Sequence, residues 1–136
     1  MIVSECTLEV RYYETDLMGI VHHSNYIRYF ECGRSDMMAK VGLPIDAIEK
    51  AGVMLPIVAV ECKYRRPALM GDRIRIVSMI DTLPTAKLVV NSEIYNQKDE
   101  LLCKGSVTLG FLDAATRRPI RCPKDLVAVI EKHMNL

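Results

Sequence analysis

The hydrophobic pattern of the chain changes period near Ser24, and this change constrains the fold more than any other feature. Before it, residues 2–13 mix β-branched and aromatic side chains with charges in partial alternation, which is typical of a half-buried strand. The apolar and small residues after it recur at intervals of three and four: Tyr26, Tyr29, Phe30, Gly33, Met37 and Met38. This spacing predicts a helix that Ser24 or Asn25 caps and that Gly42 and Pro44 end.

Strand patterns dominate the rest of the chain. A short helical turn is predicted for "IDAIEKAG", and "PKDLVAVIEKH" predicts a terminal helix over residues 123–133. The β-rich runs are 57–66, 72–83, 86–96 and 101–112, and short polar or proline-containing connections suited to antiparallel hairpins separate the last three. One strand, one long helix, four strands and a terminal helix predict an α+β fold whose antiparallel sheet wraps the long helix.

Size and charge limit the possible functions. The chain has 136 residues, half of them hydrophobic, so residues 1–136 are expected to form a single globular domain. Eighteen Lys and Arg against seventeen Asp and Glu leave a formal charge of +1. No global field would therefore attract nucleic acid or an anionic membrane, and any bound anion must be held by a local cluster.

The cysteines and the N-terminal residues indicate the cellular compartment in which the protein is expected. The five cysteines are odd in number, widely spaced and free of any C-x-x-C pair, which fits neither a disulfide framework nor a zinc ribbon. We interpret them as reduced thiols, mostly small core residues, in a cytoplasmic protein. A basic leader and an apolar run long enough to cross a bilayer are both lacking, so neither secretion nor a membrane span is expected.

The segment "ETDLMGIVHHSNYIRYFECGR" carries the candidate chemistry. The start of a helix presents unpaired N–H groups, so the amides near His23 to Asn25 could bind an anion or polarise a carbonyl oxygen. Asp16, on the preceding loop, is the available nucleophile or general base, and Gly19 allows close approach of the backbone to a ligand. The alternative is that Asp16 is only a turn residue, since aspartate and glycine are common in turns.

Other polar side chains in this segment have simpler interpretations. His22 and His23 are adjacent and point different ways, so no metal site is predicted. Cys32 lies in a helical run rich in core residues, where a thiol is expected to be buried and inert. Glu31 and Arg34 are spaced for an ion pair on the helix surface.

A basic cluster follows the strand at 57–66. Arg65 and Arg66 lie beside Lys63, and arginines suit bidentate recognition of phosphate. The cluster could hold a phosphorylated ligand or could be solvated surface, and the residues alone leave both interpretations open.

Two linked motifs resemble those of a known family. The run "RYYETDLMGIVHHSNYIRYFECGR", with Thr15, Asp16, Gly19 and Tyr26, and the later "KYRRPALMGD" are similar to the signature of hotdog-fold acyl-CoA thioesterases. The resemblance is to the 4-hydroxybenzoyl-CoA thioesterase class, especially its Tol-Pal-associated short-chain branch. It implies a curved five-stranded sheet around one long helix, and dimers, often paired into tetramers, with active sites at subunit interfaces.

The resemblance also implies the reaction and its residues. It implies hydrolysis of an acyl-CoA to a carboxylic acid and free CoA, and no cofactor is expected. Asp16 would be the nucleophile or general base, and the backbone amide of His23 would polarise the thioester carbonyl. The expected substrate-binding residues are Gly19, Val21, Tyr26, Arg65 and Arg66, the two arginines meeting the phosphates of CoA.

Three alternatives stay open at this point. A hotdog hydratase or dehydratase would use Asp16 with His22 or His23 as acid and base. A catalytically silent module would bind acyl-CoA or another protein without turnover. An acyl carrier protein could replace CoA as the carrier, because both end in phosphopantetheine. Met18 and His22 depart from the familiar pattern, so we expect an acyl pocket of different shape and polarity.

Overall fold

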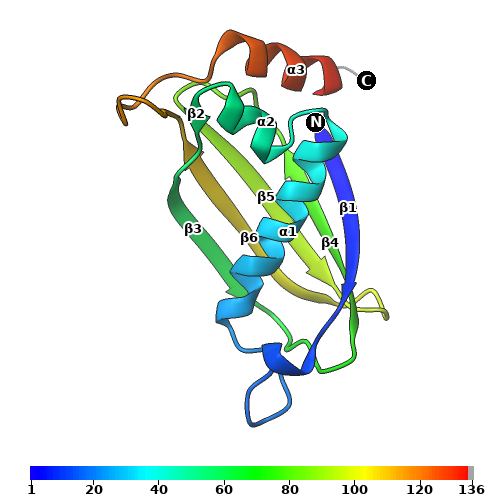
Figure 1. Ribbon diagram of the computed structural model, residues 1–136. Helices are drawn as coiled ribbons and strands as arrows, with labels where there is room; N and C mark the ends of the chain where they lie inside the picture. The colour runs from blue at the N-terminus through cyan, green and yellow to red at the C-terminus, as the bar shows by residue number, and fades with distance from the viewer. Residues whose placement is uncertain (135–136) are drawn as a thin grey trace.

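The computed structural model describes residues 1–134 as one antiparallel sheet wrapped around a long helix (Figure 1). The sheet has five strands in the order β1-β4-β5-β6-β3. Their bounds are β1 Ile2–Glu9, β3 Ile57–Tyr64, β4 Arg73–Ile80, β5 Lys87–Tyr95 and β6 Leu101–Gly110. The predicted hotdog fold and α+β class are confirmed.

Helix α1, Ser24–Lys40, crosses the concave face of the sheet. The residues of the predicted apolar period are all buried: Tyr26, Tyr29, Phe30, Gly33, Met37 and Met38. Gly33 is the point of closest approach, because a Cβ added there would lie 2.6 Å from Cγ2 of Ile76 and 2.5 Å from Oγ of Ser78 on β4. The helix thus packs on the sheet through a glycine that leaves no room for a side chain.

Smaller elements close one end of the sheet. Helix α2 (Ile45–Lys50) follows α1, and helix α3 (Lys124–Met134) lies beyond it at the same end (Figure 1). Strands β2 (Val53–Met54) and β7 (Leu112–Asp113) form a separate two-stranded sheet there. The sequence pattern does not predict β2 and β7, because two residues are too few to show an alternation.

The first predicted strand is too long. Strand β1 ends at Glu9, and Tyr12–Glu14 form the 3-10 turn η1. In this turn the Glu14 side chain accepts a hydrogen bond of 2.8 Å from the Arg11 amide, and Glu14 is buried. The turn redirects the chain from the edge of the sheet toward the start of α1.

Strand β3 is an edge of the sheet and is unusually exposed. It pairs with β6 on one side only, with a bulge between Ile57 and Ala59. Its large exposed apolar side chains are Ile57, Val58, Val60 and Tyr64. An apolar edge strand of this length presents unpaired backbone groups that a second chain could bind.

The cysteines differ from the expectation. All five are free thiols, but only Cys103 and Cys122 are buried, while Cys6 and Cys62 are half-buried. Cys32 is exposed, so its predicted place in the core is wrong. It follows Glu31 on the outer side of α1, away from the buried stripe. Within residues 1–134, no helix is long and apolar enough to span a membrane.

Candidate active site

The loop that carries Asp16 is a tight turn between η1 and α1. The Asp16 amide donates to the Ile20 carbonyl at 2.9 Å, and the Gly19 amide donates to the Asp16 carbonyl at 3.1 Å. Gly19 has a φ of +76°, which a residue with a side chain rarely adopts. Its role is therefore to allow the turn, and it is not among the residues that line the nearby cavity.

The Asp16 carboxylate takes part in this turn and also faces the cavity. Its Oδ1 accepts a hydrogen bond of 2.8 Å from the Met18 amide, as in an Asx turn. Within the described residues, Oδ2 forms no hydrogen bond, and Asp16 is exposed and lines the cavity. The turn interpretation and the chemical one are thus compatible, because each uses a different oxygen.

Helix α1 begins differently from the prediction. His23 occupies the N-cap, and no side chain caps the helix by a hydrogen bond, so the predicted cap by Ser24 or Asn25 is wrong. The buried Asn25 side chain instead donates to the Glu14 carbonyl at 2.8 Å. His22 donates its amide to the same carbonyl at 2.9 Å. These two bonds attach the helix start to η1.

The amide of His23 differs from its neighbours in having no partner among the described residues. The His22 and Ser24 amides donate to the Glu14 carbonyl and to Nδ1 of His22, respectively. By contrast, the His23 N–H donates to no acceptor in the part of the chain that the structure describes. A free amide at the positive end of a helix is a strong donor to an oxygen that gains negative charge.

Asp16 and His23 meet in one cavity of about 340 Å³. Its lining residues are Asp16, Ile20, Val21, His23, Tyr26, Tyr64, Arg65, Arg66 and Pro67. The structure therefore brings together all the predicted site residues except Gly19. The additional lining residues are Ile20, Tyr64 and Pro67. Tyr64 and Pro67 belong to the motif "YRRPA", and that motif was the signal that could have identified them.

Two tyrosines form one wall of this cavity. The Tyr64 hydroxyl donates to the His23 carbonyl at 3.2 Å, and the Tyr26 hydroxyl accepts from the Ala68 amide at 3.0 Å. The rings meet edge to face, with centroids 5.2 Å apart. Loss of hydration, with a lesser effect of Cys62, raises the pKa of Tyr64 to about 12, and burial raises the pKa of Tyr26. Both phenols are neutral near pH 7 and serve as hydrogen-bonding groups.

The two arginines are not equivalent. Arg66 forms an ion pair of 3.0 Å with Glu100 on the neighbouring segment. Among the described residues, Arg65 has no carboxylate partner, and its amide is fixed to the Leu102 carbonyl at 2.8 Å. Of the two arginines that line the cavity, Arg65 is therefore the one without an ion pair in the described part of the chain.

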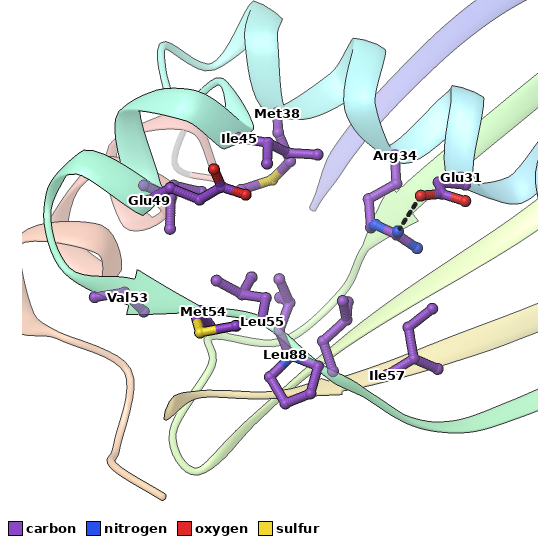
Figure 2. A pocket seen from close by; sticks show the side chains of 13 residues that line it. Glu31, Arg34, Met38, Ile45, Glu49, Val53, Met54, Leu55, Ile57 and Leu88 are labelled. Carbon is purple, nitrogen blue, oxygen red and sulfur yellow. Dashed lines mark ion pairs between the residues drawn. The ribbon is translucent and has the colours of Figure 1, made fainter. Parts of the chain in front are cut away.

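A second cavity of about 310 Å³ lies between α1, α2 and the start of β3 (Figure 2). It is mostly apolar, and Arg34 extends into it from α1 toward the strands. The predicted pair with Glu31 exists, at 3.9 Å, but it is not a surface pair, because Arg34 is only 8% exposed. The spacing in the sequence therefore predicted the contact between Glu31 and Arg34 but not the burial of Arg34.

The side chains of His22 and His23 lie against each other, so the prediction that they point different ways is wrong. Their rings stack with centroids 4.2 Å apart, and Nδ1 of His22 lies 2.8 Å from the Ser24 hydroxyl. Over residues 1–134, no group of three or more His, Cys, Asp or Glu side chains is arranged to hold a metal ion.

Comparison with known proteins agrees with this architecture. Residues 10–130 match the thioesterase-like superfamily. A Bacillus subtilis protein named "Putative acyl-CoA thioesterase YneP" is 35% identical over 124 residues, which cover 91% of this chain and 90% of that protein. The Escherichia coli O157:H7 acyl-CoA thioester hydrolase YbgC is 26% identical over 121 residues, covering 89% and 90% of the two chains.

A solved structure is similar over the whole length. The DHNA-CoA thioesterase of Staphylococcus aureus superposes with a TM-score of 0.92 at 30% sequence identity, covering 100% of this chain and 93% of that one. The matched residues include both motifs and the long helix. The chain therefore belongs to the thioesterase-like superfamily and has its hotdog fold.

Proposed function

We propose that this protein hydrolyses an acyl-CoA thioester, with Asp16 and the His23 amide as the groups that act on the thioester. The observation that carries the proposal is that Asp16 and His23 line the same cavity, while among residues 1–134 one oxygen of the Asp16 carboxylate and the His23 amide have no hydrogen-bond partner. Membership of the thioesterase-like superfamily and the names of the relatives support this reaction.

The chemistry follows from these two groups. The His23 N–H would donate to the thioester oxygen as negative charge develops on it, an interaction worth about 3 kcal/mol in other hydrolases. Asp16 would attack the carbonyl carbon to form an anhydride that water then hydrolyses, or would take a proton from an attacking water. In either case the C–S bond breaks and CoA leaves as a thiolate, which needs little acid assistance.

Arg65 would hold the phosphates of CoA. It lines the cavity and lacks an ion-pair partner among the described residues, whereas Arg66 forms an ion pair with Glu100. A guanidinium is suited to bidentate phosphate binding. We therefore assign the larger contribution to Arg65 and a lesser one to Arg66.

We further propose a homodimer formed through β3, which would pair again into a homotetramer. The support is the exposed apolar edge of β3, including Val58 and Val60. Antiparallel pairing of β3 with a second copy would continue the sheet and satisfy the free backbone groups of both edges.

Asp16→Asn tests the proposed reaction. Release of free thiol from a panel of acyl-CoAs should fall by at least about a hundredfold, because amide nitrogen and oxygen are poor nucleophiles and bases. Asp113→Asn is the matched control, since Asp113 also accepts backbone amides in a turn, from Ala115 and Thr116, but lies away from the cavity. Undiminished turnover by Asp16→Asn would disprove the role of Asp16.

Two further measurements separate a thioesterase from a hydratase and from a silent binding module. Incubation with an enoyl-CoA should release thiol from a thioesterase, whereas a hydratase would remove the conjugated double bond and release none. Binding of CoA esters without thiol release over the whole panel would identify a silent binding module.

A further inference from the structure

We propose that the Arg34 cavity is the acyl pocket of the active site on the partner protomer, and that Arg34 selects acyl groups bearing a carboxylate or phenol oxygen. The proposal rests on the proposed thioesterase function and deepens it. It names the class of acyl group and the residue that recognises it.

The cavity combines an apolar wall with one buried cation. The apolar lining includes Met38, Ile45, Leu55 and Leu88, and Arg34 extends into this space (Figure 2). A volume of about 310 Å³ is at the lower end of the range typical of small-ligand sites. Such a lining fits a ligand that is apolar over most of its surface and has a polar group at one end.

Arg34 lacks the partners that a buried guanidinium needs. Its side chain is 10% exposed, and burial lowers its pKa. Its one ion pair within residues 1–134, with Glu31, is long at 3.9 Å, and the Glu31 side chain is 60% exposed. Across residues 1–134, the guanidinium donates no hydrogen bond within 3.5 Å. Burying a cation whose N–H groups have no acceptor costs free energy, and a ligand oxygen that accepts their hydrogen bonds would offset that cost.

The charge of the lining indicates where that oxygen would lie. Glu31 and Glu49 also line the cavity, but both are exposed, so their carboxylates are hydrated. Of these three charged side chains, Arg34 is the one that is largely buried, and electrostatic attraction is stronger there. The planar guanidinium of Arg34 can donate two parallel hydrogen bonds to a carboxylate, and its N–H groups can also donate to a phenol oxygen.

Within one protomer this cavity is too far from Asp16. Ile57, the first residue of β3, lines the Arg34 cavity, whereas Tyr64, the last, lines the Asp16 cavity. The two ends of this strand are about 23 Å apart at the usual rise per residue. Along α1 the separation is smaller, because Arg34 lies eight residues, about 12 Å, beyond Tyr26 of the Asp16 cavity. A short or aromatic acyl group held at Asp16 is still too short to reach Arg34 in the same protomer.

Antiparallel pairing of β3 with the β3 of a second copy would place the Arg34 cavity of one protomer near the Asp16 cavity of the other. A two-fold axis through the middle of β3, perpendicular to the sheet, would set Ile57 of one protomer beside Tyr64 of the other. Both α1 helices would then lie on the same face of the continuous sheet. The Arg34 cavity of one copy would thereby adjoin the Asp16 cavity of its partner, and each active site would be incomplete without the second copy.

Selectivity for matched acyl-CoAs tests the proposal. The pairs are hexanoyl-CoA with adipoyl-CoA, octanoyl-CoA with suberoyl-CoA, and benzoyl-CoA with 4-hydroxybenzoyl-CoA. For at least one pair, the wild type should hydrolyse the oxygen-bearing member with a kcat/KM at least tenfold higher. Arg34→Met should bring that ratio to one or below, because the oxygen-bearing member loses the guanidinium that would bind its oxygen.

Two further variants keep the result decisive. Arg34→Lys retains the positive charge but loses the paired N–H donors of the guanidinium, so it should keep only part of the preference for the carboxylate. Glu31→Gln removes the competing carboxylate at an exposed position and should raise that preference. If Arg34→Met does not fold, the wild type and Glu31→Gln decide, and absence of preference in both would overturn the proposal.

Failure of this inference differs from failure of the proposed function. Hydrolysis of both members of every pair at equal rates, or an equal loss of both in Arg34→Met, would refute selection by Arg34 and leave the thioesterase reaction intact. Hydrolysis of no acyl-CoA would refute the reaction itself. In that case the dissociation constants of the same ester pairs, measured by calorimetry with the wild type and Arg34→Met, would still decide the role of Arg34.

Discussion

The hydroxyl of Tyr64 donates a hydrogen bond of 3.2 Å to the carbonyl oxygen of His23 and so joins the end of β3 to the start of α1. Among residues 1–134, the amide of the same residue, His23, donates to no acceptor. A side chain from the edge strand therefore helps to fix the orientation of the peptide group next to the proposed oxyanion donor.

Tyr64→Phe tests this link. The variant retains the ring against Tyr26 and loses the hydrogen bond to His23. Because the peptide group is then less well oriented, the activation free energy should rise by about 1 kcal/mol and kcat should fall by about fivefold. Thiol-release kinetics measure the change. Tyr95→Phe is a control, because Tyr95 bonds Glu93 and does not line the site cavity. An equal loss in both variants would contradict a local role for Tyr64.

The pH dependence of Tyr64 gives a second prediction. Its pKa of about 12 lies above the ordinary value of 10, so folding favours the protonated phenol. The stabilising contribution of the protonated Tyr64 phenol is therefore complete below pH 10 and is lost as the pH rises through 12. The ratio of wild-type to Tyr64→Phe activity should stay constant from pH 6 to 9. A ratio that falls within that range would show that the phenol ionises earlier.

Gly33→Ala should destabilise the protein although alanine is the better helix former. The added Cβ would lie 2.6 Å from Cγ2 of Ile76, so helix and sheet must separate, at a cost of about 1–3 kcal/mol. Denaturant unfolding measures the loss. Cys32→Ala is the control, since Cys32 is the preceding residue on the exposed side and should change the free energy of unfolding by less than about 0.5 kcal/mol.

Thiol reactivity should follow burial. Cys32 is exposed, whereas burial raises the pKa of Cys122 to about 11. At pH 8 iodoacetamide should alkylate Cys32 first and Cys122 only after denaturation, because the thiolate is the reactive form. Peptide mass spectrometry identifies the modified residue. Cys32→Ser should also retain full thioesterase activity, and a loss greater than tenfold would make this thiol part of the reaction.

Val60→Glu tests the dimer through β3. Val60 is near the middle of the strand and is 37% exposed, so a proposed two-fold axis there would bring two added carboxylates together. Sedimentation should show a shift toward monomer, and thiol release should fall with it. Val89→Glu, at 38% exposure on β5, is the matched control and should keep the wild-type mass. Equal behaviour of the two variants would exclude β3 as the interface.

Local patterns in the sequence were sufficient for most of the fold. The period from Tyr26 to Met38 predicted α1 and its buried stripe, because residues three and four apart share one face of any helix. The strands were predicted to within a few residues, except β2 and β7, which are too short to show a pattern. The end of β1 was misplaced, because Tyr12 and Tyr13 are aromatic like strand residues but form η1.

The sequence by itself determined the order of elements, the α+β class and the motif that contains Asp16 and His23, since these depend on residues close together in the chain. Only the tertiary structure decided which distant residues meet. It brought Tyr64 and Arg65 beside Asp16, buried Arg34 in an apolar cavity, and left Cys32 in water. Burial depends on which elements pack together, and the spacing of Glu31 and Arg34 is the same on a covered helix face as on a solvated one.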